Sequence, residues 1–304
     1  MQQQLEYWSA RLADAPALIE LPTDKPRPAV QTFNGSGESR VIDADLSAAL
    51  QALARSENTT LFILLLTAFS ALLSRYASSD DIIIGTPISG RSDPSLEDIV
   101  GIFLNTLALR CDLSGNPRFC DLLAKTRNDV LDAFSNQDLP FEKLVDELQP
   151  GRDMSHSPLF QVMFTLNSSE PSPLVLESLD VSAVSFDYGT AKFDLNLSMT
   201  DTAQGFGAHL EYNTDLFKRS TIERILNQFE SLLHSIVTSP DTGVADLQLL
   251  DEAERSRLLH DFNPAPESLK AQQTPCMVWL NGSAILRLIA SHWKMQQRSL
   301  ITNV

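Results

Sequence analysis

Cysteine is scarce in this sequence, whose 304 residues contain only Cys111, Cys120 and Cys276. An odd and widely spaced set provides neither a disulfide framework nor the Cys-x-x-Cys pairs typical of structural zinc sites. Histidine is also sparse, and no histidine lies within four residues of another. This spacing does not support a His-based metal cluster, and we expect no resident metal ion.

Motifs that carry self-contained chemistry are missing as well. The sequence has no Gly-x-Ser-x-Gly, no Walker phosphate loop, no Gly-x-Gly-x-x-Gly and no His-Glu-x-x-His. Each of these motifs places a nucleophile, a phosphate cradle or metal ligands at a fixed spacing. Composition and spacing alone therefore identify no catalytic residue.

Long apolar runs and targeting signals are also absent. The strongest apolar run, residues 61–73, is followed by Arg75 and is shorter than the roughly 20 residues that span a bilayer. The first residues lack the basic flank and apolar stretch of a signal peptide. We therefore expect a buried core helix at this run, no membrane association and a cytoplasmic location.

Charge of one sign dominates, because 39 Asp and Glu outnumber 23 Lys and Arg, for a formal net charge of −16. This balance argues against a nucleic-acid partner, since phosphate contacts need clustered Lys and Arg. Acidic residues stop at Glu267, however. The segment 268–304 contains no acid and four bases, Lys270, Arg287, Lys294 and Arg298.

The chain is expected to have three parts, and the break in charge marks the beginning of the last one. Residues 1–250 form a folded domain, residues 251–267 a linker, and residues 268–304 a divergent basic tail that does not fold as part of the domain. A frameshifted, recombined or misjoined end is the favoured explanation of the tail. A basic amphipathic surface segment is the alternative.

Hydrophobic periodicity predicts helices first, then one strand, more helices, and a second half rich in strands. The Pro-rich stretch 22–28 cannot be helical and is expected to be a connector lying along a surface. This order indicates a layered α/β domain with a mixed sheet flanked by helices. The expected helices are 2–13, 45–57, 60–76, 118–134, 141–148, 220–237 and 251–260. The expected strands are 37–43, 81–85, 104–113, 160–166, 174–186, 193–200 and 207–212.

Three polar segments stand out against this scaffold. Asn105 and Thr106 interrupt an apolar strand, and such groups need hydrogen-bond partners when they are buried. They either satisfy neighbouring backbone groups or line a cleft. Residues 136–138, Asn-Gln-Asp, are either a polar helix end or part of a site. Arg152 and Asp153 can form an ion pair that fixes the loop before the next strand.

These segments resemble three signature motifs of the condensation domains of nonribosomal peptide synthetases. The family patterns Val/Ile-Gly-x-Phe-x-Asn-Thr-x-x-x-Arg, Asn/His-Gln-Asp-x-Pro-Phe-Glu and Arg-Asp-x-Ser-x-x-Pro-Leu match residues 100–110, 136–142 and 152–159, in that order. Residues 6–28 and 84–91 resemble two further family passages. The segment ending at residues 261–263 resembles the linker that leads into an adenylation domain.

The resemblance implies a chloramphenicol-acetyltransferase-like fold, of which this chain is the C-terminal subdomain. The family's catalytic motif, His-His-x-x-x-Asp-Gly, belongs to the N-terminal half, and this sequence has no adjacent histidines. We therefore expect a fragment that is inactive alone and needs the missing N-terminal half. The alternative is a non-catalytic carrier-protein docking or scaffold fragment.

By resemblance, the reaction joins a donor acyl or peptidyl thioester to an acceptor aminoacyl thioester and forms an amide bond. The implied partners are acyl or peptidyl carrier protein domains, whose phosphopantetheine arms enter a tunnel between the two halves. An adenylation domain is a further possible partner, and no cofactor binds the chain directly. The resemblance implies substrate-tunnel positions at Arg91, Asn105, Thr106, Asn136, Gln137 and Asp138, and a structural motif at Arg152 and Asp153.

Overall fold

The computed structural model describes residues 1–261, apart from 92–93, 149–152, 168–187 and 203. Residues 1–249 form one compact unit. The helices of this unit are α1 (Gln2–Arg11), α2 (Ala44–Ser56), α3 (Leu61–Ala77), α4 (Phe119–Ser135), α5 (Phe141–Leu148) and α6 (Arg219–Thr238), with 3₁₀ turns at η1 (Pro94–Leu96) and η2 (Val244–Asp246). The described part of the second unit consists of α7 (Glu252–Ser256) and the short π-helix η3 (Arg257–Asp261).

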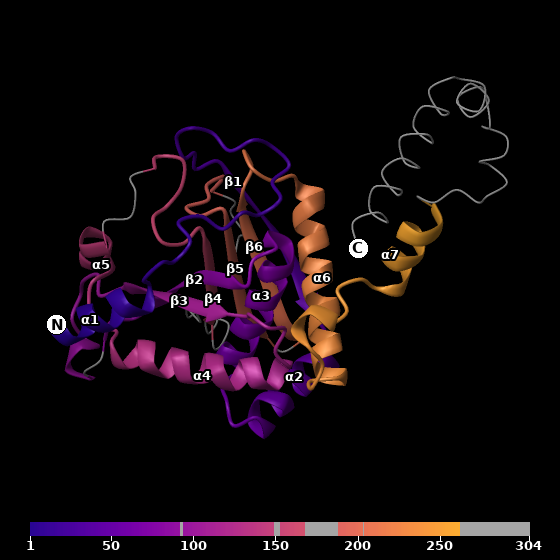
Figure 1. Ribbon diagram of the computed structural model, residues 1–304, viewed down its shortest axis with the longest axis horizontal. Helices are drawn as coiled ribbons and strands as arrows, with labels where there is room; N and C mark the ends of the chain where they lie inside the picture. The colour runs from indigo at the N-terminus through magenta and orange to yellow at the C-terminus, as the bar shows by residue number, and fades with distance from the viewer. Residues whose placement is uncertain (92–93, 149–152, 168–187, 203, 262–304) are drawn as a thin grey trace, which may run out of the picture. The chain divides into compact units, whose positions relative to one another are not determined.

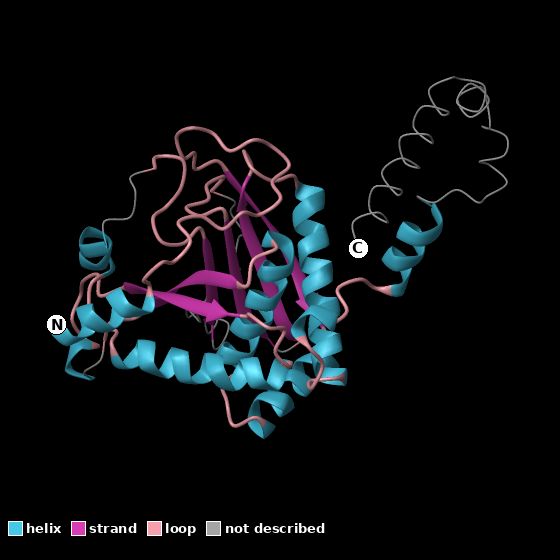
Figure 2. Cartoon of the chain, viewed as in Figure 1, coloured by secondary structure: helices cyan, strands magenta, loops and turns pink. Residues whose placement is uncertain are grey.

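Six strands form a single mixed sheet in the order β1-β6-β5-β4-β2-β3. The pairs β4–β5 and β2–β4 are parallel, and the other neighbours are antiparallel. Figures 1 and 2 show these strands beside the helices of the same unit. The predicted mixed α/β architecture is therefore confirmed. The strands are β1 (Gly35–Ile42), β2 (Asp81–Ile88), β3 (Asn105–Asp112), β4 (Val162–Asn167), β5 (Leu195–Thr202) and β6 (Gly205–Asn213).

Helix α3 is the centre of the helical layer, where it contacts α2, α4, α6 and β2. It begins at the N-cap Thr60, whose side chain accepts a hydrogen bond from the Ile63 amide, and ends at Ser78 in the left-handed conformation. Every side chain from residue 63 to 73 is buried. The hydroxyls of Thr67 and Ser70 are satisfied by carbonyls one turn earlier. The expectation of a buried core helix is confirmed.

Alternation along β5 shows which face of the sheet carries the core. Leu195, Leu197 and Met199 are buried, whereas the intervening Asn196, Ser198 and Thr200 are partly exposed. Because neighbouring strand residues point to opposite faces, the apolar set packs toward the helices and the polar set covers the other face. The same alternation occurs in β6, where residues 206, 208, 210 and 212 are buried.

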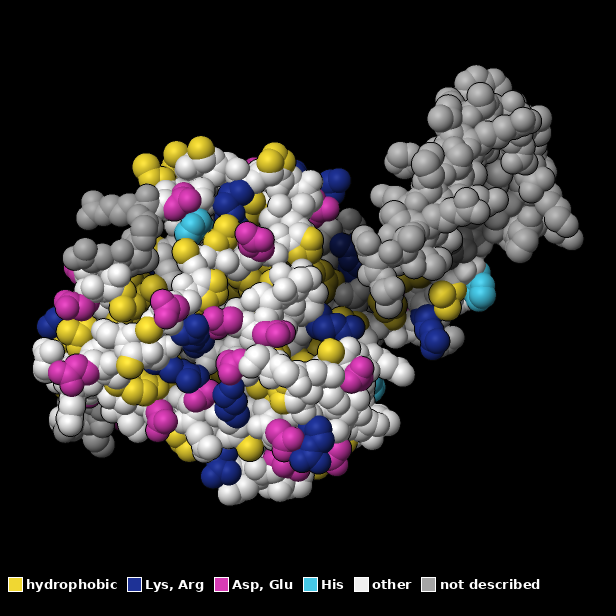
Figure 3. All heavy atoms as spheres, in the orientation of Figure 1, with side chains coloured by type: hydrophobic (Ala, Val, Ile, Leu, Met, Phe, Trp, Pro, Cys, Tyr) yellow, Lys and Arg dark blue, Asp and Glu magenta, His cyan; other side chains and the backbone are white. Residues whose placement is uncertain are grey.

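Two predictions fall on residues that the structure does not describe, and a third concerns membrane-spanning helices. The expected strand at 174–186 and the tail at 268–304 lie outside the described residues. No single helix among the described residues is both long and apolar enough to cross a membrane, although the bent pair α2 and α3 passes by length and composition. On the face drawn in Figure 3, basic and acidic side chains are interleaved.

Candidate functional site

Asn105 joins the first residue of β3 to the segment between α4 and α5. Its Nδ2 donates hydrogen bonds to the carbonyls of Gln137 and Leu139, each at 2.9 Å. Its Oδ1 accepts the backbone N–H of Phe141 at 3.0 Å. One amide side chain therefore fastens the Leu-Pro turn before α5 to the edge strand.

Helix α1 also binds the segment between α4 and α5, through two of its side chains. Trp8 is 2% exposed, and its indole N–H donates to the Asn136 carbonyl at 2.9 Å. Gln4 lies one turn earlier on the helix, and its Nε2 donates to Asp138 Oδ2 at 3.0 Å. The side chain of Asn136 bonds back to the Asp132 carbonyl at the end of α4. The predicted residues 136–138 are thus held between α1, α4 and β3.

Arg91 organises the loop that runs from β2 to β3. Its guanidinium donates to the carbonyls of Leu96 and Ile99, the second at 2.9 Å, and it stacks 4.2 Å from the centre of the Phe103 ring. Gly90 precedes it with φ +61°, and a Cβ there would clash with the Phe103 carbonyl oxygen. Only glycine fits this backbone, which turns the chain so that Arg91 reaches its own loop.

The loop gathered by Arg91 carries an exposed apolar surface. Val100 is 100% exposed, Ile102 is 93% exposed, and Ile99 and Leu104 are also largely exposed. Scattered exposed apolar residues are ordinary on soluble surfaces, but four within six positions of one loop form a concentrated patch. We call residues 99–104 the apolar loop.

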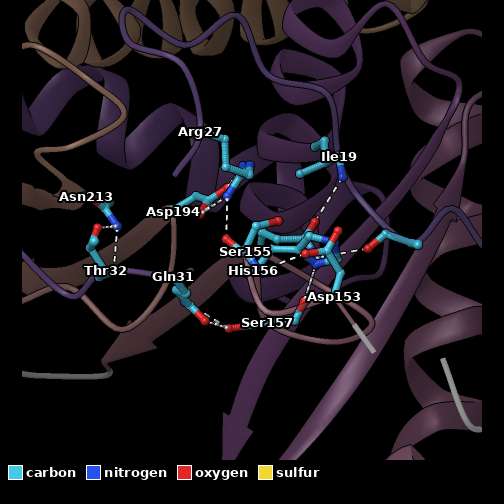
Figure 4. Close-up of polar contacts among 12 residues, drawn as sticks. Ile19, Arg27, Gln31, Thr32, Asp153, Ser155, His156, Ser157, Asp194 and Asn213 are labelled. Carbon is cyan, nitrogen blue, oxygen red and sulfur yellow. Dashed lines mark hydrogen bonds and ion pairs between the residues drawn. The ribbon is translucent and has the colours of Figure 1, made fainter. Parts of the chain in front are cut away.

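A second polar cluster lies between the Pro-rich connector and β5. Arg27 forms a two-pronged ion pair with Asp194, with Nη1 at 3.1 Å from Oδ1 and Nη2 bonded to Oδ2. The Asp194 side chain is 2% exposed and that of Arg27 is 18% exposed. Figure 4 shows Arg27 reaching both Asp194 and the Ser155 carbonyl. The connector is therefore anchored through a buried charge pair.

Asp153 lies near this cluster rather than near Asn105. Its Oδ1 accepts the Ser155 backbone N–H at 2.8 Å, and this bond holds the pKa of the carboxyl below its usual value. Its Oδ2 lies 3.7 Å from His156 Nε2, as drawn in Figure 4. Arg152 lies outside the described residues, so the ion pair expected between Arg152 and Asp153 stays a prediction.

Gln161 completes the anchoring of the connector. Its Oε1 accepts the Ile19 amide at 2.9 Å, and its Nε2 donates to the carbonyls of Ala17 and Ser157. The sequence pattern alone indicates no role for Gln161, Arg27 or Asp194. Arg27 sits in a family-like Pro-Arg-Pro passage, which is the available signal, but its partner is 167 residues away.

The cysteines described are poor nucleophiles. Burial is the main cause that raises the pKa of the Cys111 thiol. Burial, aided by the nearby Glu57 carboxylate, raises the pKa of Cys120 to about 11. Because the thiolate is the reactive form, neither side chain is activated for covalent catalysis.

The structure therefore brings Asn105 together with residues 136–138. It places Thr106 beside Asn105 on β3, opposite Pro87 of β2, and Arg91 in the loop that leads into β3. Asp153 belongs to the separate cluster around Arg27. The tunnel roles predicted for these residues stay predictions, while their described contacts are with the protein's own backbone and side chains.

Replacing Asn105 with alanine is expected to destabilise the fold by about 2–4 kcal/mol, because three hydrogen bonds of about 1 kcal/mol each are lost. Hydrogen exchange at the Phe141 amide should accelerate, since this N–H loses its acceptor. Urea unfolding and exchange measured by NMR test both effects.

The matched control for this experiment is Asn136→Ala, which removes one exposed bond to Asp132 from the same region. It should change the unfolding midpoint far less than Asn105→Ala. Equal effects of the two substitutions, or unchanged exchange at Phe141 in the Asn105 variant, would contradict the role given to Asn105.

Comparison with known proteins shows which family this chain resembles in sequence and structure. The family model of the condensation domain matches residues 1–259. The chain is 44% identical over 275 residues to one of the linear gramicidin synthase proteins of Brevibacillus parabrevis, covering 90% of this chain and 5% of that protein. It is 44% identical over 268 residues to malpinin synthetase of Mortierella alpina, covering 88% of this chain and 4% of that one. The chain thus spans a small part of these relatives.

Solved structures agree with this placement. A four-domain nonribosomal peptide synthetase, holo-AB3403 bound to AMP and glycine, matches with a TM-score of 0.79 at 26% identity, over 84% of this chain and 20% of that chain. The X-domain from teicoplanin biosynthesis matches with a TM-score of 0.76 at 26% identity, over 82% and 57% of the respective chains.

Proposed function

The chain belongs to the condensation-domain family, and from this premise we propose that it contributes one wall of a tunnel in which two carrier-bound thioesters are joined. Condensation domains of nonribosomal peptide synthetases form peptide bonds. In the reaction proposed here, the amine of an acceptor aminoacyl thioester attacks the carbonyl of a donor acyl or peptidyl thioester. The C–N bond forms, the C–S bond breaks, and the donor's thiol is released.

The observation that carries this proposal is the family match over residues 1–259, which includes all three signature segments. The sequence itself has no adjacent pair of histidines. We therefore propose that the catalytic His-His-x-x-x-Asp-Gly segment is provided from outside these 304 residues. The chain's own contribution is then positioning, which can account for a large part of a rate enhancement.

The site geometry supports a positioning role. Asn105 fixes the turn before α5, and Arg91 fixes the loop that leads into β3. Side chains bound in this way set the shape of a wall without taking part in bond making. Thr106, next to Asn105 on β3, is the side chain that we place on the substrate side.

The apolar loop supports the proposal that a further segment of polypeptide covers this end of the unit. Val100 and Ile102 are almost fully exposed, and covering apolar surface is favourable by about 25 cal/mol per Å². The proposed catalytic segment is the occupant that would also complete the tunnel. Carrier domains would then present their phosphopantetheine arms to that tunnel.

An assay of amide formation tests this function. One carrier protein is loaded with an acyl group and a second with an amino acid, and the product is followed by mass spectrometry. The 304-residue chain alone is expected to give only background product. A mixture of the chain with a separately produced segment that carries His-His-x-x-x-Asp-Gly, taken from a relative, is expected to give amide.

Two outcomes would count against the proposal. Turnover by the chain alone would show that the missing histidines are not required. A stable complex with the added segment that gives no product, under conditions where the intact relative is active, would favour a non-catalytic docking or scaffold role.

A further inference from the structure

A mixed group of metal-ligating side chains lies where the β1–α2 turn meets α6. One carboxylate oxygen each from Asp43 and Glu230 and one ring nitrogen of His234 all lie within 4.8 Å of one another. Asp43 is the N-cap of α2, and Glu230 and His234 lie one turn apart on α6. Helix α6 packs against both α2 and β1, so the core fixes the backbone positions of all three residues.

The spacing of these atoms suits a single ion. Zinc donors lie about 2.0–2.2 Å from the metal in a tetrahedral arrangement, which places two donors of one ion about 3.3–3.6 Å apart. The three ligand atoms lie within 4.8 Å of one another, so the side chains must rotate to bring them closer by up to about 1 Å. Asp43 and His234 are exposed and Glu230 is partly exposed, so these side chains have room to rotate toward a shared ion.

The surrounding charges also favour a cation. Arg40 pairs with Glu230 Oε2 and reaches Asn227, and the Leu46 amide donates to Asp43 Oδ1 at 2.8 Å. These contacts hold one oxygen of each carboxylate, and we assign the other oxygen of each to the ion. Two carboxylates and one guanidinium leave a local charge of −1. An imidazole among the ligands favours a transition metal over Mg²⁺ or Ca²⁺.

We propose that Asp43, Glu230 and His234 form a surface site for a divalent transition-metal ion such as Zn²⁺. Three protein ligands would hold the ion, and water would complete its coordination. The ion would link the β1–α2 turn to α6, two regions far apart in the sequence. This site is independent of the amide-forming reaction proposed above.

Calorimetric titration of the full chain with ZnCl₂ tests the site. A Cys276→Ser background removes a thiol that would compete for zinc. The protein is expected to bind one Zn²⁺ and to unfold at a higher temperature in its presence. His234→Ala and Asp43→Asn are each expected to weaken binding at least about tenfold, as losses at metal sites commonly do.

The variants are chosen so that the fold survives. Asparagine caps a helix about as well as aspartate does, so Asp43→Asn keeps α2 but loses a charged ligand. His260→Ala removes an exposed histidine elsewhere in the sequence and should leave zinc affinity unchanged. Equal zinc affinity in the parent protein, His234→Ala and Asp43→Asn would overturn the proposal, as would the absence of zinc binding by the parent.

Titration with MgCl₂ should give much weaker binding, and equal affinity for Mg²⁺ would overturn the assigned metal class.

Discussion

Replacing Arg27 with methionine is expected to lower the free energy of unfolding by about 3–5 kcal/mol, the usual cost of leaving one member of a buried ion pair without its partner. Asp194 is 2% exposed and faces Arg27 with both oxygens. Without the guanidinium, this carboxylate must stay charged in a poorly solvated place, take up a proton or open the structure to water. Urea unfolding followed by circular dichroism measures the loss.

A double variant separates the cost of an orphaned charge from the cost of lost packing. Arg27→Met with Asp194→Leu removes both charges and should be more stable than Arg27→Met alone, because apolar replacements of a buried pair are often neutral. The exposed pair Arg118–Asp121 provides the surface control, and Arg118→Ala should leave the unfolding midpoint nearly unchanged. A single Arg27→Met variant as stable as the parent would contradict the anchoring role of the pair.

This pair also shows what the sequence could and could not predict. The prolines of residues 22–28 correctly exclude a helix and predict a connector along a surface. The partner of Arg27 lies on the segment before β5, 167 residues away. Neither the prolines nor hydrophobic periodicity gives information about such distant polar pairing, so the sequence predicts a surface connector but not its anchor.

The elements themselves are largely predictable because their patterns are local. The predicted helix at 141–148 has the observed bounds of α5, and the apolar run at 61–73 lies within α3. The strand expected at 81–85 is too short, because Gly85 favours an end there. Strand β2 continues to Ile88, where residues 86–88 still pair with β3. The order of strands in the sheet depends on long-range packing, which local patterns do not predict.

The sequence predicts which residues form the candidate site better than it predicts the contacts that their atoms make. Resemblance selects Asn105 and residues 136–138, and the structure joins them by hydrogen bonds. Which atoms meet depends on Trp8 and Gln4 of α1, more than a hundred residues earlier in the chain. No local pattern links that helix to this loop.

The second large effect concerns catalysis rather than stability. Amide formation by the reconstituted mixture is expected to fall about 10²–10⁴-fold when the second histidine of the added His-His-x-x-x-Asp-Gly segment is changed to alanine, the range typical for loss of a general acid or base. The reason is that the described part of this chain offers no alternative group for the proton transfer. Its described thiols are held in the unreactive form, and its sequence offers no paired histidines to take over the proton transfer.

Changes within this chain should behave differently from that histidine variant. Thr106→Val keeps a β-branched side chain and should alter amide formation far less than loss of the histidine does. Because Thr106 is proposed to position a substrate rather than to transfer a proton, its effect should be larger on the substrate concentration needed for half-maximal rate than on the maximal rate.

The decisive experiment is single-turnover amide formation by the mixture of this chain with the histidine-bearing segment, compared with the same mixture carrying the His→Ala change. We predict product in the first mixture and a rate near background in the second, with the two segments still associated in both. Equal rates in the two mixtures would contradict the claim that the catalytic group is provided from outside these 304 residues.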